Sequence, residues 1–217
     1  VYYWTGEVTE GEFEPNDEVD EIRWLSIDDA CALMTYDLDR QVLRKAQKRF
    51  GTPADARVLY VRHAHAHERE KWSGDDNLRP LDKKGRRQSE MLVPLLSAFS
   101  PERIYSAAPE RCQTTVAPLA DELGIDVAVD ERFGDEAWLS DMVGAQRAFT
   151  EVIEQGGTSV VCAQGDVIPG MIAWLSAQGT LPIDTEIHAK KGSVWVLSFH
   201  GGQLTGADYV PSALPVL

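Results

Sequence analysis

Two arginines and a histidine occupy positions from which side chains could hold and attack an anionic group. Arg62 and His63 follow directly after the apolar run Arg57–Val61, which predicts a buried strand. Arg111 stands at the start of a predicted helix that follows the short predicted strand Arg103–Ser106. The planar guanidinium of arginine can bond two oxygens of a phosphate, and the backbone N–H groups of a helix start also favour anions. The pattern therefore predicts a phosphate-binding pocket that contains an imidazole.

The segment that begins at Arg62 supports this prediction. Residues 62–87 carry eight basic and five acidic side chains, although the formal charge of the 217-residue chain is −14. This loop includes Arg69, Trp72 and Arg79, which we expect to contact the substrate. The Trp72 ring would either stack on a base or cover the edge of the core.

Four other basic side chains carry less chemical information. His65 and His67 either join the pocket or face water, and water is the simpler interpretation. Lys190 and Lys191 precede a predicted strand, and we expect both to be solvated rather than bound to phosphate. We therefore leave all four out of the predicted site.

Strands and helices alternate after residue 56, and this alternation predicts how the candidate residues are positioned. The expected strands cover residues 57–61, 103–106, 126–129, 158–163, 193–199 and 203–208, and the expected helices cover residues 83–99, 109–124, 140–155 and 167–178. Such alternation is typical of a three-layer α/β/α sandwich with a mostly parallel sheet, in which ligands bind beyond the carboxyl ends of the strands. Arg62, Ser106 and Gln164-Gly165 would then meet at one edge, where Gly165 lets the backbone approach a ligand.

The first fifty residues differ from the rest. Residues 1–29 hold ten acidic side chains against one basic one, whereas residues 40–49 hold five basic ones at the spacing of an amphipathic helix. We predict strands over Val1–Trp4 and Ile22–Leu25, a helix that begins at Ser26, and a linker over residues 51–56. Two strands and two short helices cannot enclose a core, so this segment must pack on other residues.

Composition excludes several classes of protein. A formal charge of −14 argues against a binder of nucleic acid or of an anionic membrane, and no apolar run is long enough to span a bilayer. The first residues lack the pattern of a signal peptide. Three widely spaced cysteines form neither a disulfide framework nor a zinc site, which indicates a reducing cytoplasm. The first residue is not Met, which suggests a fragment or a processed product.

Three motifs, in the expected order, resemble those of the histidine phosphatase family, which has the phosphoglycerate-mutase-like fold. Arg62-His63-Ala64 resembles the Arg-His-Gly that ends the first strand of the family. Arg79–Gln88 resembles its R-P-L-[TD]-x-x-G-x-x-Q signature, which is strongest in the SixA-like branch. Ser106–Thr114 resembles its S-S-P-x-x-R-C-x-Q-T stretch. The resemblance spans residues 57 to 210, within a domain that we expect to cover residues 57–217.

This resemblance implies a phosphohistidine mechanism. His63 would attack phosphorus, and water would later hydrolyse the phosphohistidine. Arg62 and Arg111 would bind the non-bridging oxygens. Glu131 would protonate the leaving group, with Glu136 as a second candidate. The mechanism needs no metal ion or other cofactor in this domain.

One position departs from the family pattern, because the second histidine of the family falls on Gln164. Glutamine keeps a hydrogen-bond donor for phosphate but loses the positive charge. The loss of one charge-assisted contact predicts a rate that is about 10- to 100-fold lower.

Residues 1–50 resemble the C-terminal part of a Nudix domain, because Glu18–Ala30 is similar to the E-V-x-E-x-x-W-[LV] strand and following helix of MutT-type proteins. The Nudix box and its Mg²⁺-binding glutamates are absent, although Asp121–Gly124 imitates the end of the box. The box would lie before Val1, so we expect the chain to be the C-terminal piece of a longer polypeptide. The alternative is a full-length protein with an unrelated acidic extension.

Together the two parts resemble two-domain MutT-type hydrolases that act on oxidised guanine nucleotides and dinucleoside polyphosphates. The resemblance implies a cytoplasmic phosphohydrolase that removes 8-oxo-(d)GTP, with a nucleoside polyphosphate substrate and a Nudix portion in the same or a neighbouring molecule. A phosphoglycerate mutase fits the Nudix-like residues less well. The other alternative is a non-catalytic phosphate-binding module, in which Gln164 marks a degenerate site that assists a Nudix active site.

Overall fold

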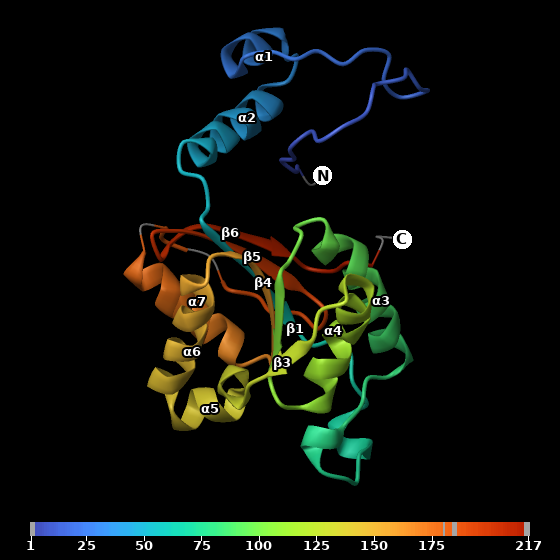
Figure 1. Cartoon of the computed structure of the whole chain (residues 1–217), viewed down its shortest axis with the longest axis vertical. Helices are drawn as coiled ribbons and strands as arrows, with labels where there is room; N and C mark the ends of the chain where they lie inside the picture. The colour runs from blue at the N-terminus through green and yellow to red at the C-terminus, as the bar shows by residue number, and fades with distance from the viewer. Residues whose placement is uncertain (1–2, 180, 184–185, 215–217) are drawn as a thin grey trace. The chain divides into compact units, whose positions relative to one another are not determined.

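The computed structural model describes residues 3–179, 181–183 and 186–214, and the chain divides into two compact units, Val1–Pro53 and Ala54–Leu217. The first unit is drawn in blue in Figure 1, and the second contains the sheet. None of the helices in the described ranges is both long and apolar enough to cross a lipid bilayer.

Helices α1 (Ile27–Leu33) and α2 (Asp37–Phe50) are the regular elements in the described part of the first unit. The Ser26 hydroxyl accepts a hydrogen bond from the Asp29 N–H and so caps α1, as its position in the sequence predicts. The strand predicted over Ile22–Leu25 is wrong, and so is the part of the strand over Val1–Trp4 that the structure describes, since Tyr3 and Trp4 are irregular. Val1 and Tyr2 lie outside the described residues.

These two segments have the composition of strands, but among the described residues neither pairs with a neighbouring strand. A strand leaves its N–H and C=O groups unpaired unless a neighbouring strand accepts them, so one run of β-favouring residues does not form a sheet alone. In the described part of this unit both segments are exposed, including Trp24. The helices satisfy their own backbone groups, and for this reason they form where the strands do not.

The second unit is built on a six-stranded mixed sheet with the strand order β3-β2-β4-β1-β5-β6. Its strands are β1 (Ala56–Arg62), β2 (Arg103–Ser106), β3 (Val127–Val129), β4 (Gly157–Ala163), β5 (Val194–His200) and β6 (Gln203–Val210). The first four strands pair in parallel, whereas β5 runs antiparallel to both β1 and β6. The carboxyl ends of the four parallel strands therefore lie along one edge.

Helices cover both faces of this sheet. They are α3 (Lys83–Ser97), α4 (Glu110–Leu123), α5 (Asp135–Ser140), α6 (Met142–Glu154) and α7 (Val167–Gln178), with short 3₁₀ turns η1 (Arg69–Lys71), η2 (Asp76–Leu78) and η3 (Glu131–Phe133). Helices α3 and α4 lie on one face of the sheet and α5 to α7 on the other, as Figure 1 shows. The predicted α/β class is confirmed.

Capping residues set the helix bounds. The Asp82 side chain accepts from the Gly85 N–H at the start of α3, and Pro109 and Gly124 flank α4. The helix expected over residues 140–155 is α6, and a short helix that was not expected, α5, precedes it. Asp141 ends α5, and its carboxylate caps α6 by accepting the Gly144 N–H.

The core lies between the sheet and both helix layers. Tyr60 of β1 is 1% exposed and meets Phe149 of α6 edge to face, with ring centroids 4.9 Å apart. On the opposite face, Leu92 and Leu96 of α3 and Val116 of α4 are buried to the same degree. This packing holds the strand ends in fixed positions.

Candidate active site

The three strand ends singled out in the sequence lie side by side in the structure. Arg62 at the end of β1 pairs with Ala163 of β4, and Ser106 at the end of β2 pairs with Cys162. The loops that follow these strands therefore start at the same edge of the sheet. They carry His63, Ala107 to Pro109 and Gln164 into one region.

Backbone hydrogen bonds fix His63 at this edge. Its N–H donates to the Ala163 carbonyl at 3.0 Å, and its side chain is almost fully buried, with 5% of the residue exposed. The next N–H, that of Ala64, donates to Thr115 Oγ1 at 2.9 Å. The Thr115 hydroxyl in turn donates to the Arg111 carbonyl at 2.6 Å. The His63 loop is thus joined directly to the first turns of α4.

The imidazole of His63 is held in one tautomer. Its Nδ1 lies 2.8 Å from the Ala64 carbonyl, which can only accept, so Nδ1 carries the proton and Nε2 carries the lone pair. The pKa of His63 is lowered to about 3, mainly by burial; the hydrogen bond to the Ala64 carbonyl opposes this shift, and the positive charges of Arg111, Arg62 and Lys191 add to it. A neutral imidazole with a free Nε2 is the form that can act as a nucleophile.

Arg62 lies against the loop after β4. Its Nη1 donates to the Ala189 carbonyl, and its buried Nε meets no hydrogen-bond acceptor among the described residues. A Cβ on residue 165 would clash with the Arg62 guanidinium, so a larger residue there would require Arg62 to move. We expected Gly165 to approach a substrate, and in the structure its close neighbour is the Arg62 guanidinium.

The carboxylate of Asp76 pairs with three arginines, of which Arg111 also acts on His63. The buried Arg111 donates through Nη1 to the Asp76 carbonyl at 2.6 Å, and its Nη2 lies 3.1 Å from Asp76 Oδ2. Arg79 Nε donates to Asp76 Oδ1 at 2.8 Å, and the exposed Arg69 donates to both carboxylate oxygens. Burial alone would raise the pKa of Asp76, but these hydrogen bonds and the charge of Arg111 hold it well below its ordinary value.

Trp72 lies in the same loop and is fixed by it. The indole N–H donates to the Asp75 carbonyl at 2.9 Å, and the ring lies beside that of His67, with centroids 6.4 Å apart. These contacts are within the loop rather than with the core of the second unit. His65 has a structural partner, because its Nδ1 lies 2.7 Å from the Asp82 carboxylate that caps α3.

Gln164 is oriented by the segment after β3. Its Oε1 accepts the Asp135 N–H at 3.1 Å, so the amide NH₂ group must point away from Asp135. Asp135 Oδ1 in turn accepts the N–H groups of Asp166 and Val167, at 3.0 and 2.8 Å, at the start of α7. Burial raises the pKa of Asp135, and the nearby Asp166 adds to the effect.

Asp135 was missed in the sequence. The sequence predicts Glu131, at the start of η3, and Glu136 as the acidic residues of the site, and both are exposed in the structure. Asp135 stands in the same short segment, but its partners lie about thirty positions further along the chain. The signal in the sequence was a carboxylate in the first turn of a helix that follows the third strand.

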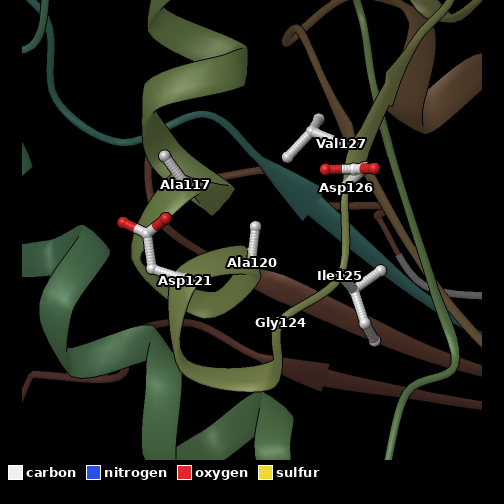
Figure 2. A pocket seen from close by; sticks show the side chains of 7 residues that line it. All are labelled: Ala117, Ala120, Asp121, Gly124, Ile125, Asp126 and Val127. Atoms are coloured by element: carbon white, nitrogen blue, oxygen red, sulfur yellow. The ribbon is translucent and has the colours of Figure 1, made fainter.

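A separate hollow of about 440 Å³ does not suit an anion. It lies where α4 ends and β3 begins, and Figure 2 shows its lining residues: Ala117, Ala120, Asp121, Gly124, Ile125, Asp126 and Val127. The charged side chains of this lining are acidic. Phosphate is therefore better matched by the opposite edge of the sheet, where Arg62, Arg79 and Arg111 lie.

Within the described residues no group of three or more His, Cys, Asp and Glu side chains is arranged to hold a metal ion. The basic residues around His63 instead provide donors for an oxyanion. The geometry can bind a tetrahedral anion and present a neutral Nε2 to its centre.

Known proteins share this fold and part of this sequence. Residues 58–146 match the profile of the histidine phosphatase superfamily (branch 1). An 8-oxo-(d)GTP phosphatase of Mycolicibacterium smegmatis is 43% identical over 211 residues, which cover 97% of this chain. The match covers 64% of that protein, so this chain spans less than two thirds of the length of its relative.

Solved structures resemble the second unit. The protein histidine phosphatase SixA, complexed with tungstate, superposes with a TM-score of 0.59 at 17% identity, over 72% of this chain and 97% of that one. A mycobacterial glucosyl-3-phosphoglycerate phosphatase gives a TM-score of 0.56 at 19% identity, over 72% and 98% of the two chains. The profile match identifies a histidine phosphatase superfamily region over residues 58–146, and the solved structures share the fold of the second unit.

Proposed function

We propose that the second unit is a phosphohydrolase that works through a phosphohistidine at His63. The observation that carries this proposal is the state of His63, which is buried, neutral and protonated on Nδ1 between two arginines. A histidine that served only to bind an anion would gain from being charged. Here the surroundings suppress the charge and leave Nε2 free to form a bond.

In the proposed reaction Nε2 attacks phosphorus as the bond from phosphorus to the leaving oxygen breaks. The positive charge that develops on the imidazole ring is shared with the Ala64 carbonyl through Nδ1–H. Arg62 and Arg111 bind the non-bridging oxygens, and the Gln164 NH₂ group donates to one of them. Water then attacks the phosphohistidine, releases phosphate and restores the neutral imidazole.

The leaving oxygen needs a proton if it departs as an alcohol. Glu131 is the donor that the family resemblance implies, and its exposed carboxylate is free to follow a substrate. Asp135 is less suited to this role, because Oδ1 already accepts two backbone N–H groups. We therefore propose Glu131 as the general acid and propose that Asp135 orients Gln164.

Nucleotides are the proposed substrates. The name of the Mycolicibacterium smegmatis relative supports 8-oxo-(d)GTP, and 43% identity across nearly the whole chain supports a shared substrate class. We also propose dinucleoside polyphosphates as substrates, and the cytoplasm as the compartment in which the enzyme acts. The free thiols of Cys31, Cys112 and Cys162 are compatible with that compartment.

The first unit is proposed to belong to a Nudix fold whose other part is supplied by the same or a neighbouring polypeptide. The Nudix box and its glutamates are not in this sequence, so the residues present do not fit a Nudix Mg²⁺ site. No step proposed for His63 passes through a metal ion. Nucleic acid and membranes are not among the proposed partners.

A second candidate function rests on Gln164. If this glutamine marks a degenerate site, the pocket would hold phosphate for a Nudix active site without turning it over. Both functions predict phosphate binding, so binding alone does not separate them. The test must detect a bond to His63 or the release of phosphate.

The proposal is tested by phosphate release from 8-oxo-GTP, GTP, GDP and diadenosine tetraphosphate in excess EDTA, with acid-labile phosphate on the chain measured in parallel. EDTA silences any Mg²⁺-dependent Nudix contaminant. We expect turnover by the wild type and a loss of at least about a thousandfold in His63→Ala, because the nucleophile is gone.

His200→Ala is the matched control, since the exposed His200 ends β5 at the opposite edge of the sheet. It should keep full activity. Phosphate binding without release in the wild type would reject the enzyme and leave the binding module. Release that survives in His63→Ala would reject His63 as the nucleophile.

A further inference from the structure

The turn before β5 is hydrogen-bonded to the backbone of the candidate active site. The Gly192 N–H donates to the carbonyls of both Arg62 and His63, at 3.1 and 3.2 Å. Arg62 reaches back to the Ala189 carbonyl. Gln88 of α3 holds the turn from the other side, because its Nε2 donates to the Lys191 carbonyl at 3.0 Å. Residue 191 is therefore fixed beside the nucleophile rather than left on a free loop.

The Lys191 side chain stands among positive charges. Burial lowers its pKa, and so do the charges of Arg62, Arg79 and Arg111, while Asp82 acts in the opposite direction. Within the described residues no carboxylate forms an ion pair with the ammonium, since Asp82 is engaged by His65 and by the start of α3. An ammonium held near three guanidinium groups is stabilised when an anion enters between them.

The positive charge at this edge exceeds what one phosphoryl group requires. Even after the negative charge of Asp76 is counted against Arg111 and Arg79, the cations near Lys191 outnumber the two charges of the phosphate that reacts at His63. Arg79 is bonded to Asp76 and to the His67 carbonyl. Lys191 remains as a further cation for a second anionic group.

We propose that Lys191 binds the phosphate next to the reacting one in a nucleoside di- or triphosphate, and so selects a polyphosphate chain over a phosphate monoester. This inference rests on the proposed function, because it deepens the substrate class of the same site. It differs from the sequence analysis, which expected Lys191 to be solvated.

The test compares Lys191→Gln with Lys190→Gln in the full chain. Lys190 is the neighbouring residue and is exposed, so its replacement removes the same charge away from the pocket. We measure KM and kcat for GTP and for p-nitrophenyl phosphate in EDTA. Lys191→Gln should raise KM for GTP roughly tenfold, the effect of one charge-assisted contact, with KM for p-nitrophenyl phosphate unchanged. Lys190→Gln should match the wild type with both substrates.

Other results would overturn the inference. Unchanged KM for GTP in Lys191→Gln would show that Lys191 does not bind the chain of phosphates. An equal fall in kcat with both substrates would place Lys191 on the reacting phosphoryl group instead.

Calorimetric binding of inorganic triphosphate and of orthophosphate separates this inference from the proposed function. If the wild type releases no phosphate, the proposed function fails, but the binding comparison still decides the role of Lys191. Weaker binding of triphosphate, and not of orthophosphate, in Lys191→Gln would support it. Equal binding by both lysine variants would reject it.

Discussion

The two units of the chain use similar local signals and reach different degrees of burial. Both contain helices with side-chain caps, Ser26 for α1 and Asp82 for α3. In the described part of the first unit, Cys31 is the single buried hydrophobic side chain, and Trp24 is 78% exposed. The second unit encloses a continuous core on both faces of its sheet. Capping residues and apolar periodicity therefore favour helices in either unit. A buried core forms only where the apolar faces of these helices pack against another apolar surface.

Charged groups differ between the two units in the same way. The ion pairs of the first unit, such as Arg44 with Asp28, are exposed, and such pairs contribute little to stability. The second unit buries His63, Arg79 and Arg111 at one edge of its sheet. Burying such groups costs free energy unless their partners are provided, and Asp76 provides them for both arginines. The core of the second unit is thus the support that its site requires.

The largest difference should appear in stability. Phe149→Ala removes a buried ring from the contact with Tyr60 and should lower the free energy of unfolding by about 3–5 kcal/mol. Trp24→Ala removes a larger but exposed ring and should change it by less than about 0.5 kcal/mol. Urea unfolding followed by circular dichroism measures both. An equal loss in Trp24→Ala would contradict the comparison, since it would mean that the first unit buries Trp24.

A second difference should appear with pH, because all five histidines lie in the second unit. Unfolded His63 takes up a proton below pH 6.5, its ordinary pKa, whereas folded His63 does so only near pH 3. Above pH 6.5 the residue adds no pH dependence. From pH 6.5 towards 3 it should remove up to about 1.4 kcal/mol of stability per pH unit.

Urea unfolding of the wild type and of His63→Asn at pH 7, 6 and 5 measures this effect. Asparagine does not titrate, and the carboxylates common to both chains cancel in the difference. The wild type should lose stability relative to the variant as the pH falls. A difference that stays constant over this range would show that His63 keeps an ordinary pKa.

Features that depend on neighbouring residues could be predicted from the sequence, whereas features that depend on a residue far along the chain could not. Strand ends at Arg62, Ser106 and Ala163 followed from short apolar runs, and the bounds of α4 followed from Pro109 and Gly124. The strand over Ile22–Leu25 failed because nothing in the described part of the first unit pairs with it.

The site shows the same limit. Arg62, His63 and Arg111 could be found by type and position, because each follows a predicted strand. The position of Lys191 depends on a turn that is hydrogen-bonded to Arg62, through Ala189, which lies 127 positions further along the chain. The position of Asp135 depends on its hydrogen bond with the start of α7. No pattern within either segment reports such contacts.

The smallest expected effect is on the activity of Asp135 variants. It distinguishes a residue that orients Gln164 from one that donates a proton to the leaving group. If Asp135 orients Gln164 and the start of α7, then Asp135→Ala should lower kcat about tenfold, as expected when one phosphate donor is misplaced. Asp135→Asn should restore most of this loss, because an amide oxygen can still accept the N–H groups of Asp166 and Val167. Asp28→Asn in the first unit is the matched control and should leave kcat unchanged.

Phosphate release from p-nitrophenyl phosphate and from an alkyl phosphate, whose leaving group needs a proton, gives the measurement. Loss of the alkyl phosphate activity alone in Asp135→Asn would instead identify Asp135 as the acid and remove Glu131 from that role.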